Sequence, residues 1–266
     1  MTDLALIAGR GRLPVLVAEA AEAVVLPVHG ADCDLAGEMP FRLERLASTM
    51  DRLRDLGVRR ICLAGGVDRP ILERALIEPA SLPHIERIAA RLTGGDGGAL
   101  AALIEVLEKG GFEITAPQDV VPNLLPEPGV LIGAVSERDT LDAERAATIL
   151  AATGSLDIGQ GCVVAQGLCL AVEAHPGTDW MLASLTGDLA GRRPDPARGA
   201  GVAMKAPKPG QDRRVDLPTI GVATIEGVCR AGLAGIVIEA GGVLVPDRAE
   251  VIAAARDAEL FVWSRP

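Results

Sequence analysis

Charged side chains of both signs are concentrated in one short stretch in the second half of the chain. Cations neutralise phosphate oxygens, and a carboxylate can bind Mg²⁺ or accept a proton from water. The stretch therefore favours phosphate chemistry, although a solvent-exposed loop with surface ion pairs would contain the same residue types. Its charged residues are Lys205, Lys208, Asp212, Arg213, Arg214 and Asp216.

Prolines determine the backbone of this stretch. Pro207, Pro209 and Pro218 each lack a backbone donor and fix φ, and Gly210 adds a further break. Residues 205–221 therefore predict a stiff loop rather than a regular helix or a central strand.

The first half of the chain offers a second type of candidate, a glycine-rich turn. Gly9, Gly11, Leu13 and Pro14 follow an apolar run at Leu4–Ala8 and precede a helical pattern. In this context backbone N–H groups and the helix dipole bind phosphate. The third glycine of the dinucleotide fingerprint is absent and no acidic residue ends the second strand, so an NAD site is disfavoured. An ordinary tight turn between strand and helix remains the alternative.

Two further glycine-rich turns are expected at the same edge of the sheet. Gly65 and Gly66 end a strand at Arg60–Ala64, and Asp96 lies in the glycine run 94–98 that precedes a helix. Since ligands of open α/β sheets bind at the carboxyl ends of strands, the three turns together predict a nucleotide cleft. Each turn alone is explained as well by chain geometry, and Asp96 by capping of the next helix.

The order of elements that would position these residues is typical of α/β proteins. Residues 1–132 alternate between short apolar strands and helices, which predicts a Rossmann-like open sheet. The proline-containing segment 117–132 is expected to lead into a second, mixed α/β domain over residues 133–266. That domain is predicted to contain a strand pair, Cys162–Gln166 and Leu168–Ala174, and a hairpin of Ile236–Glu239 and Val243–Val245.

Polar residues around the predicted strand pair are further candidates for substrate binding. Glu173 ends an apolar strand, where a carboxylate is costly unless it is paired or bound to a ligand. Asp179 would equally favour a helix N-terminus, with Thr178 as the cap. The candidates in this domain are Gln160, Gln166, Gly167, Glu173, Thr178, Asp179 and Lys205.

Composition disfavours several classes of protein. The net charge of −10 argues against nucleic-acid binding and against electrostatic attachment to anionic lipid. The chain has no apolar run of about 18 residues that would predict a membrane span, and its N-terminus lacks the basic region of a signal peptide. The five cysteines show no Cys-x-x-Cys pair and are expected to be small core residues in a reducing compartment.

Several motifs of this sequence match one known family. They are Gly-x-Gly-x-Leu-Pro at 9–14, Asp-Ile-Gly-Gln at 157–160, Gly-Thr-Asp at 177–179, Lys-x-x-Lys-Pro-Gly-Gln-Asp-x-Arg-x-Asp-Leu-Pro-Thr-Ile-Gly at 205–221 and Ile-Glu-Ala-Gly at 238–241. The chain resembles, nearly end to end, the LpxI-type UDP-2,3-diacylglucosamine pyrophosphatases of lipid A biosynthesis. The motif at 205–221 is the most specific, and the dipeptide His175-Pro176 departs from the family pattern.

This resemblance implies hydrolysis of UDP-2,3-diacylglucosamine to UMP and 2,3-diacylglucosamine 1-phosphate (lipid X), with Mg²⁺ or a similar divalent cation. It also implies two domains that hold an amphiphilic substrate between them. Such an enzyme is expected to be cytoplasmic and to visit the inner-membrane surface transiently. Whether the chain forms a homo-oligomer stays open.

The resemblance also suggests roles for the charged residues. Asp216 is expected to be the essential carboxylate, either as a metal ligand or as the base for the attacking water. The metal-ligand role is favoured, since an unperturbed carboxylate is a weak base at neutral pH, unless burial raises its pKa. Lys208 and Arg214 would neutralise phosphate charge, with Asp212 as a second ligand or an orienting group. A non-catalytic protein that binds a UDP-sugar or lipid, and a sugar-nucleotide transferase that releases UDP, remain alternatives.

Overall fold

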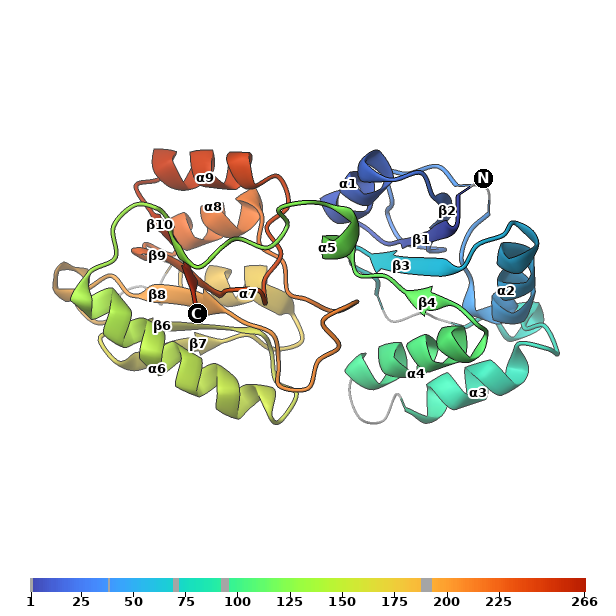
Figure 1. The fold of residues 1–266 in the computed structure, drawn as a ribbon. Helices are drawn as coiled ribbons and strands as arrows, with labels where there is room; N and C mark the ends of the chain where they lie inside the picture. The colour runs from blue at the N-terminus through green and yellow to red at the C-terminus, as the bar shows by residue number, and fades with distance from the viewer. Residues whose placement is uncertain (1, 38, 69–71, 92–95, 188–192) are drawn as a thin grey trace. The chain divides into compact units, whose positions relative to one another are not determined.

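The computed structural model describes residues 2–37, 39–68, 72–91, 96–187 and 193–266. The chain divides into two units, Met1–Pro122 and Asn123–Pro266. Each unit contains one β-sheet with helices packed against it (Figure 1). The predicted two-domain α/β organisation is confirmed.

The sheet of the first unit consists of four parallel strands. They are β1 (Leu4–Ala8), β2 (Val24–Pro27), β3 (Arg60–Ala64) and β4 (Glu113–Ile114). Their order across the sheet is β2-β1-β3-β4. A first strand that lies inside the sheet, with the next two strands on opposite sides of it, is typical of doubly wound folds. The predicted Rossmann-like domain is therefore confirmed.

Helices lie on both sides of this sheet. One side carries α1 (Arg12–Ala20) and α5 (Pro117–Val120), and Val17 of α1 packs there with Leu6 of β1 and Cys62 of β3. On the other side, α3 (Leu82–Ala90) and α4 (Asp96–Lys109) pack against each other (Figure 1). The described part of this unit also contains the α-helix α2 (Leu46–Asp55).

The sheet of the second unit consists of six strands of mixed direction. They are β5 (Gly129–Ile132), β6 (Gly161–Ala165), β7 (Leu168–Val172), β8 (Val202–Lys205), β9 (Gly235–Glu239) and β10 (Phe261–Arg265). Their order is β5-β10-β9-β8-β6-β7, in which β8, β9 and β10 are parallel. The antiparallel pair β6–β7 corresponds to the predicted strand pair, which is confirmed.

The predicted hairpin of Ile236–Glu239 and Val243–Val245 is wrong. Both edges of β9 are already hydrogen-bonded, because it pairs in parallel with β8 and β10. Residues 243–245 leave the sheet, and Leu244 forms an isolated parallel bridge with Thr219. Gly241 and Gly242 do mark a turn, but a turn does not determine which strand pairs next.

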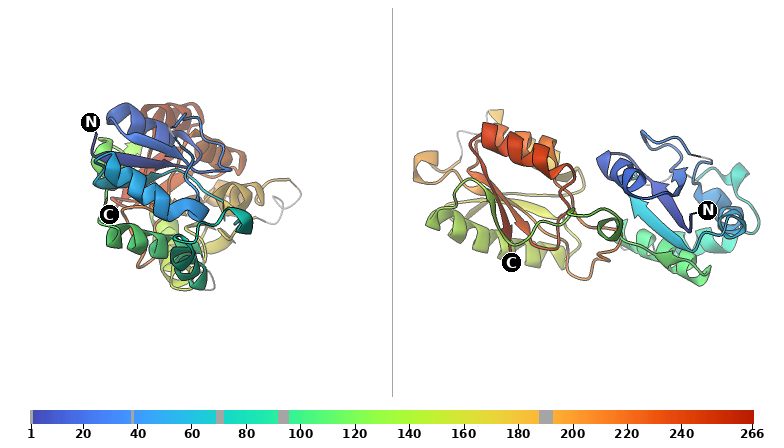
Figure 2. Two further views of the ribbon diagram at one scale, coloured as in Figure 1. Left: turned by 90° about the vertical axis from the view of Figure 1, so that its right-hand side faces the viewer. Right: turned by 45° about the horizontal axis from the view of Figure 1, so that its top comes forward.

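Helices cover both faces of the second sheet as well (Figures 1 and 2). One face packs against α6 (Glu137–Gly154), which begins at a capping box formed by Ser136 and Asp139. The other face carries α7 (Gly177–Ala183), α8 (Val222–Arg230) and α9 (Arg248–Asp257).

The division between the units falls earlier than the predicted boundary after residue 132. β5 pairs antiparallel with β10, so residues 129–132 belong to the second sheet. The segment 117–132 is therefore not a linker throughout, because α5 packs on the first unit and β5 on the second. Prolines indicated an interruption of the pattern but not the unit to which each piece belongs.

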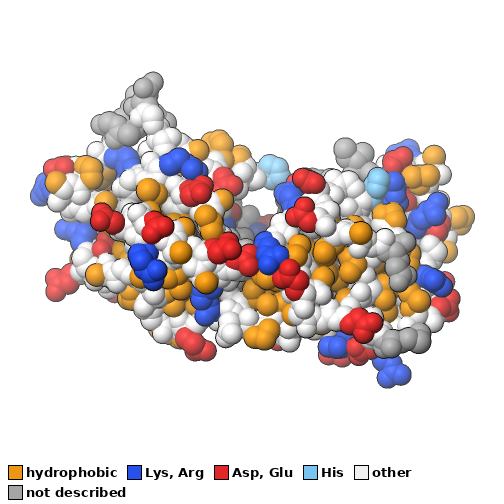
Figure 3. Space-filling view, turned by 90° about the horizontal axis from the view of Figure 1, so that it is seen from above, with side chains coloured by type: hydrophobic (Ala, Val, Ile, Leu, Met, Phe, Trp, Pro, Cys, Tyr) orange, Lys and Arg blue, Asp and Glu red, His pale blue; other side chains and the backbone are white. Residues whose placement is uncertain are grey.

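The surface and the cysteines qualify the expectations from composition. On the face shown in Figure 3, acidic and basic side chains are interspersed. No helix in the described parts of the chain is long and apolar enough to cross a membrane.

The cysteines differ in burial. Cys62 and Cys162 are buried as predicted, whereas Cys169 and Cys229 are exposed. The core role that was expected for all cysteines is therefore wrong for Cys169 and Cys229.

Candidate functional site

One edge of the second sheet brings together most of the site residues that were predicted in the second unit. β8 ends at Lys205, which aligns with Gly161 at the start of β6 and with Ile238 near the end of β9. Residues 206–221, all of them described, leave β8 at this edge and contain no helix or strand before α8, which confirms the predicted loop. The loop is tied to β6 at its start, because Ala206 N–H donates to the Gln160 carbonyl at 2.9 Å.

A buried ion pair lies at this edge. Lys205 Nζ is 3.4 Å from Glu173 Oε2 and also donates to Thr178 Oγ1. The Thr178 hydroxyl in turn donates to Glu173 Oε2 at 2.7 Å. Lys205 and Glu173 are only 7% and 8% exposed. A carboxylate at the end of an apolar strand is tolerated here because a cation and a hydroxyl both bind it.

Two glycines allow the chain to approach Glu173 closely. Gly159 has a φ of 58°, and a Cβ at this position would overlap the carbonyl oxygen of Glu173. A Cβ on Gly161 would lie 2.7 Å from Glu173 Oε2. The motif Asp-Ile-Gly-Gln-Gly is therefore explained in part by packing against the ion pair.

Lys208 carries a second cation of the loop. Its Nζ donates to Oδ1 of Asp157, which lies between α6 and β6, and the Lys208 side chain is 21% exposed. The loop packs on the end of α6, where a Cβ on Gly154 would lie 2.7 Å from Cδ of Pro209. An ammonium held by a partly exposed carboxylate is available to bind a phosphate oxygen.

The carboxyl group of Asp216 is half-buried and accepts a hydrogen bond from an amide. Gln211 Nε2 donates to Asp216 Oδ2. Burial raises the pKa of Asp216, and the nearby carboxylates of Asp157 and Asp212 raise it further. The hydrogen bond from Gln211 and the charge of Lys208 lower it. A carboxylate with a raised pKa is a better proton acceptor than the unperturbed group assumed from the sequence.

The two arginines of the loop bind different carboxylates. Arg214 is 3.0 Å from Oδ1 and 2.7 Å from Oδ2 of Asp212, and this hydrogen bonding lowers the pKa of Asp212. Arg213 extends to Glu239 at the end of β9, with a distance of 2.7 Å to Oε1. A pyrophosphate that bound here would therefore compete with carboxylates for these cations.

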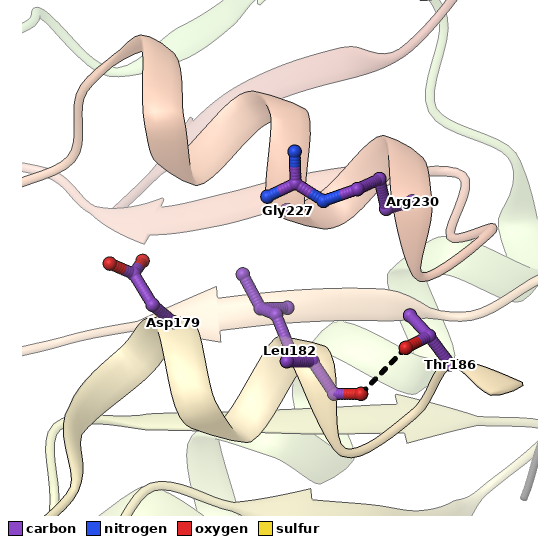
Figure 4. Close-up of a pocket in the computed structure, with 6 residues that line it drawn as sticks. Asp179, Leu182, Thr186, Gly227 and Arg230 are labelled. Carbon is purple, nitrogen blue, oxygen red and sulfur yellow. Dashed lines mark hydrogen bonds between the residues drawn. The ribbon is translucent and has the colours of Figure 1, made fainter.

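Asp179 is exposed and lines a pocket of about 330 Å³ between α7 and α8. Figure 4 shows Asp179 and Leu182 projecting from α7 toward α8, which carries Arg230. Thr178, one residue earlier, contacts Glu173 instead. In the Gly-Thr-Asp motif, Thr178 therefore contacts the buried ion pair, whereas the neighbouring Asp179 lines the pocket between α7 and α8.

Gln166 and Gly167 lie at the opposite edge of the same sheet. They join the end of β6 to β7, whereas Lys205 aligns with the start of β6. Their backbone N–H groups donate to the two oxygens of Asp142 at 3.0 and 2.7 Å. The structure thus gives these two predicted residues contacts that stabilise a turn and does not bring them to the group around Lys205.

In the first unit, glycines bring two turns into direct backbone contact. Arg10 N–H donates to the Gly66 carbonyl at 2.9 Å, and Gly66 N–H donates to the Arg10 carbonyl at 3.0 Å. A Cβ on Gly9 would lie 2.5 Å from the Gly66 oxygen, and one on Gly65 would lie 2.7 Å from the Arg10 oxygen. Close packing explains these glycines, and it occurs at the carboxyl ends of β1 and β3, where ligands of such sheets bind.

The other predicted residues of the first unit have different surroundings. Gly11 precedes α1 with a φ of 95°, Leu13 is half-buried, and Pro14 is buried against Gly65. Asp96 begins α4, but its side chain lies outside the described residues, as do Gly94 and Gly95 before it.

Three residues that hold the group around Lys205 were not among the sequence candidates. Asp157 and Gln211 lie inside quoted motifs, and Glu239 ends a predicted strand. Their partners are distant in sequence, since 51 positions separate Asp157 from Lys208. The spacing of residues along the sequence does not predict such a contact. The polar residues that lie beside glycines in the quoted motifs did indicate that these segments could belong to a site.

Two family models and one similar protein assign nearly the whole chain to the same family. Residues 3–124 match the LpxI N-terminal domain family, and residues 127–263 match the LpxI C-terminal domain family. The chain is also similar to a protein of Caulobacter vibrioides named UDP-2,3-diacylglucosamine pyrophosphatase LpxI. The two are 41% identical over 288 aligned positions, which cover 98% of this chain and 97% of the relative.

Proposed function

The chain belongs to the LpxI family, and we propose on this basis that it hydrolyses the pyrophosphate bond of UDP-2,3-diacylglucosamine in lipid A biosynthesis. The observation that carries the assignment is the identity of 41% with a protein of that name over nearly the full length of both chains. The products are UMP and 2,3-diacylglucosamine 1-phosphate, because water adds at one phosphorus and the bridging P–O bond breaks.

Asp216 is the essential carboxylate in this proposal. In the metal-free protein its half-buried position and raised pKa support the role of a proton acceptor for water. With Mg²⁺ bound, the same carboxylate would act as a metal ligand instead. The neighbouring carboxylates Asp157 and Asp212 concentrate negative charge around it, and a divalent cation would relieve that charge.

A Mg²⁺ ion fits the residues around Asp216 if the substrate phosphates and water complete its coordination. Among the described residues, no three His, Cys, Asp or Glu side chains are grouped closely enough to hold a metal by themselves. Mg²⁺ is commonly bound through one or two carboxylates together with waters and substrate phosphates, which suits a site built on Asp216. When bound, Mg²⁺ supplies positive charge to the oxygens of the pyrophosphate.

The cations of the loop bind the substrate in this proposal. Lys208 neutralises a nonbridging oxygen of the pyrophosphate by exchanging Asp157 for the phosphate, and Arg214 does so by exchanging Asp212. Lys205 keeps Glu173 as its partner and fixes the end of β8 from which the loop departs. The substrate carries acyl chains, so we also place the enzyme in the cytoplasm, in transient contact with the inner-membrane surface.

The test is the release of UMP from UDP-2,3-diacylglucosamine by the wild type and by Asp216→Ala, each with Mg²⁺ and with EDTA. We expect UMP formation that requires the metal and is lost in the variant. Asp51→Ala is the matched control, because Asp51 is 75% exposed in a surface pair with Arg54 and should leave the rate unchanged. Tight binding without UMP release would favour a binding protein, and release of UDP in the presence of an acceptor would favour a transferase.

A further inference from the structure

The side-chain amide of Gln211 makes three hydrogen bonds at the centre of the loop. Its Oε1 accepts from Gln160 Nε2 at 2.8 Å and from the backbone N–H of Lys208 at 2.9 Å. Its Nε2 donates to Asp216 Oδ2. One amide therefore connects the start of β6, the loop backbone and the carboxylate.

This arrangement determines which way the Gln211 amide faces. If the amide were reversed, its NH₂ group would face the backbone N–H of Lys208, which can only donate, and its oxygen would face the acceptor oxygen of Asp216. The hydrogen bonds are satisfied in one orientation only, in which the amide donates to the carboxylate.

The residues that hold Gln211 are themselves anchored. The Gln160 carbonyl accepts from Ala206 N–H at 2.9 Å, so Gln160 is fixed to the end of β8. Gln160 also lies between Gly159 and Gly161, which both pack on Glu173. The support for the Gln211 amide therefore comes from the sheet rather than from the loop alone.

Asp216 needs support of this kind because of the backbone on which it lies. Its N–H donates to the Asp212 carbonyl at 3.1 Å, which forms a turn, but that bond leaves the side-chain torsions of Asp216 free to rotate. The surrounding loop contains no helix or strand between residues 206 and 221 of the described chain. A reactive carboxylate on a loop loses activity when its orientation is not fixed.

We propose that Gln211 is a positioning residue for the hydrolysis: held by Gln160 and Lys208 N–H, it fixes Asp216 Oδ2 and directs Oδ1 to the reaction. This inference rests on the proposed function. Partners that orient a reactive or ligating group typically change activity about 10–100-fold when removed.

The experiment compares kcat and KM for UMP release by the wild type, Gln211→Met, Gln160→Met and the double variant. We expect Gln211→Met to lower kcat about 10–100-fold with KM within about threefold, because Asp216 keeps its charge but loses its orientation. Gln160→Met should have a smaller effect, since Lys208 N–H still holds the Gln211 oxygen. The double variant should be no slower than Gln211→Met, because Gln160 acts only through Gln211.

Ser136→Ala separates positioning from loss of stability. Ser136 caps α6 through the N–H of Asp139, at the end of the helix opposite to Gly154, so its removal destabilises the same unit without touching the loop. We expect Ser136→Ala to retain the wild-type kcat. If Ser136→Ala and Gln211→Met showed the same loss of kcat for the same loss of thermal stability, the inference would be overturned.

A second measurement uses the metal-free protein without substrate. The two side-chain amide protons of Gln211, assigned by their absence in Gln211→Met, should exchange with solvent more slowly in the wild type than in Asp216→Ala. Exchange at the rate of a free carboxamide in the wild type would overturn the inference. Failure of the wild type to release UMP would instead contradict the proposed function, and the exchange rates would still report on the contact.

Discussion

Lys205 Nζ lies 3.4 Å from Glu173 Oε2, and both side chains are almost fully removed from solvent. Removal of one member of such a pair leaves the other charge buried without its partner. We expect Glu173→Ala to lower the free energy of unfolding by about 3–5 kcal/mol, as measured by urea denaturation. The double variant Glu173→Leu, Lys205→Met should recover most of this loss, because no charge is then left in the apolar surroundings.

An exposed pair in the same unit provides the control for this first prediction. Arg230 lies 3.6 Å from Glu226 on α8, with side chains that are 68% and 58% exposed. Glu226→Ala should change the free energy of unfolding by less than about 1 kcal/mol. Equal small losses for Glu173→Ala and Glu226→Ala would contradict the importance given to burial.

Gly159 is predicted to be more sensitive to substitution than its φ alone requires. A left-handed conformation costs a non-glycine residue about 1–2 kcal/mol. Gly187 has a φ of 70° and no described residue within 4 Å of an added Cβ, so it should show that cost only. At Gly159 the Cβ would also overlap the backbone oxygen of Glu173. Gly159→Ala should therefore unfold at a lower urea concentration than Gly187→Ala, and the reverse order would refute the close approach.

The helices and strands could be predicted from the sequence, but some of the strand pairings could not. Alternating apolar runs and helical patterns predicted the doubly wound first sheet, because each βα step is local. The hairpin after β9 was wrong because the pairing of β9 with β8 and β10 depends on residues far away in the chain. Residues 129–132 were assigned to the first domain for the same reason, since their partner β10 is at the other end of the chain.

Prediction of the site shows the same limit. The loop composition gave the cations and carboxylates, and the strand end at Glu173 indicated a carboxylate that needs a partner. The sequence did not indicate that Lys205 is the partner of Glu173, or that Asp157 binds Lys208. Gln166 and Gly167 were grouped with Glu173 by their proximity in sequence, but a strand that crosses the sheet carries its two ends to opposite edges.

Two buried thiols predict a loss of stability at alkaline pH. Burial raises the pKa of the Cys62 and Cys162 thiols from an ordinary value of 9.0 to about 12. Above pH 9 the unfolded thiols lose their protons while the folded ones keep them, so stability falls as pH rises. The expected slope is about 1.4 kcal/mol per pH unit for each thiol, from pH 9 up to the folded pKa.

The pH dependence is tested by urea unfolding of the wild type and Cys62→Ala between pH 9 and pH 11. The substitution costs some packing at every pH, but the slope of stability against pH should become shallower by the contribution of one thiol. Cys229→Ala is the control, because Cys229 is exposed and its removal should leave the slope unchanged. Parallel curves for the wild type and Cys62→Ala would mean that the thiol ionises equally in both states.

Lys208 should matter for catalysis through its charge rather than through its contact with Asp157. Removal of one preorganised group that stabilises transition-state charge costs about 10²–10³-fold in rate, so Lys208→Ala should lower kcat/KM by that factor. Asp157→Asn removes the competing negative charge but leaves the ammonium in place, and its effect should be much smaller. Lys109→Ala, at a lysine that is 60% exposed, is the control for loss of a surface cation. If Asp157→Asn were as damaging as Lys208→Ala, the ion pair itself would be the required element, and the lysine would have a structural role rather than a phosphate-binding one.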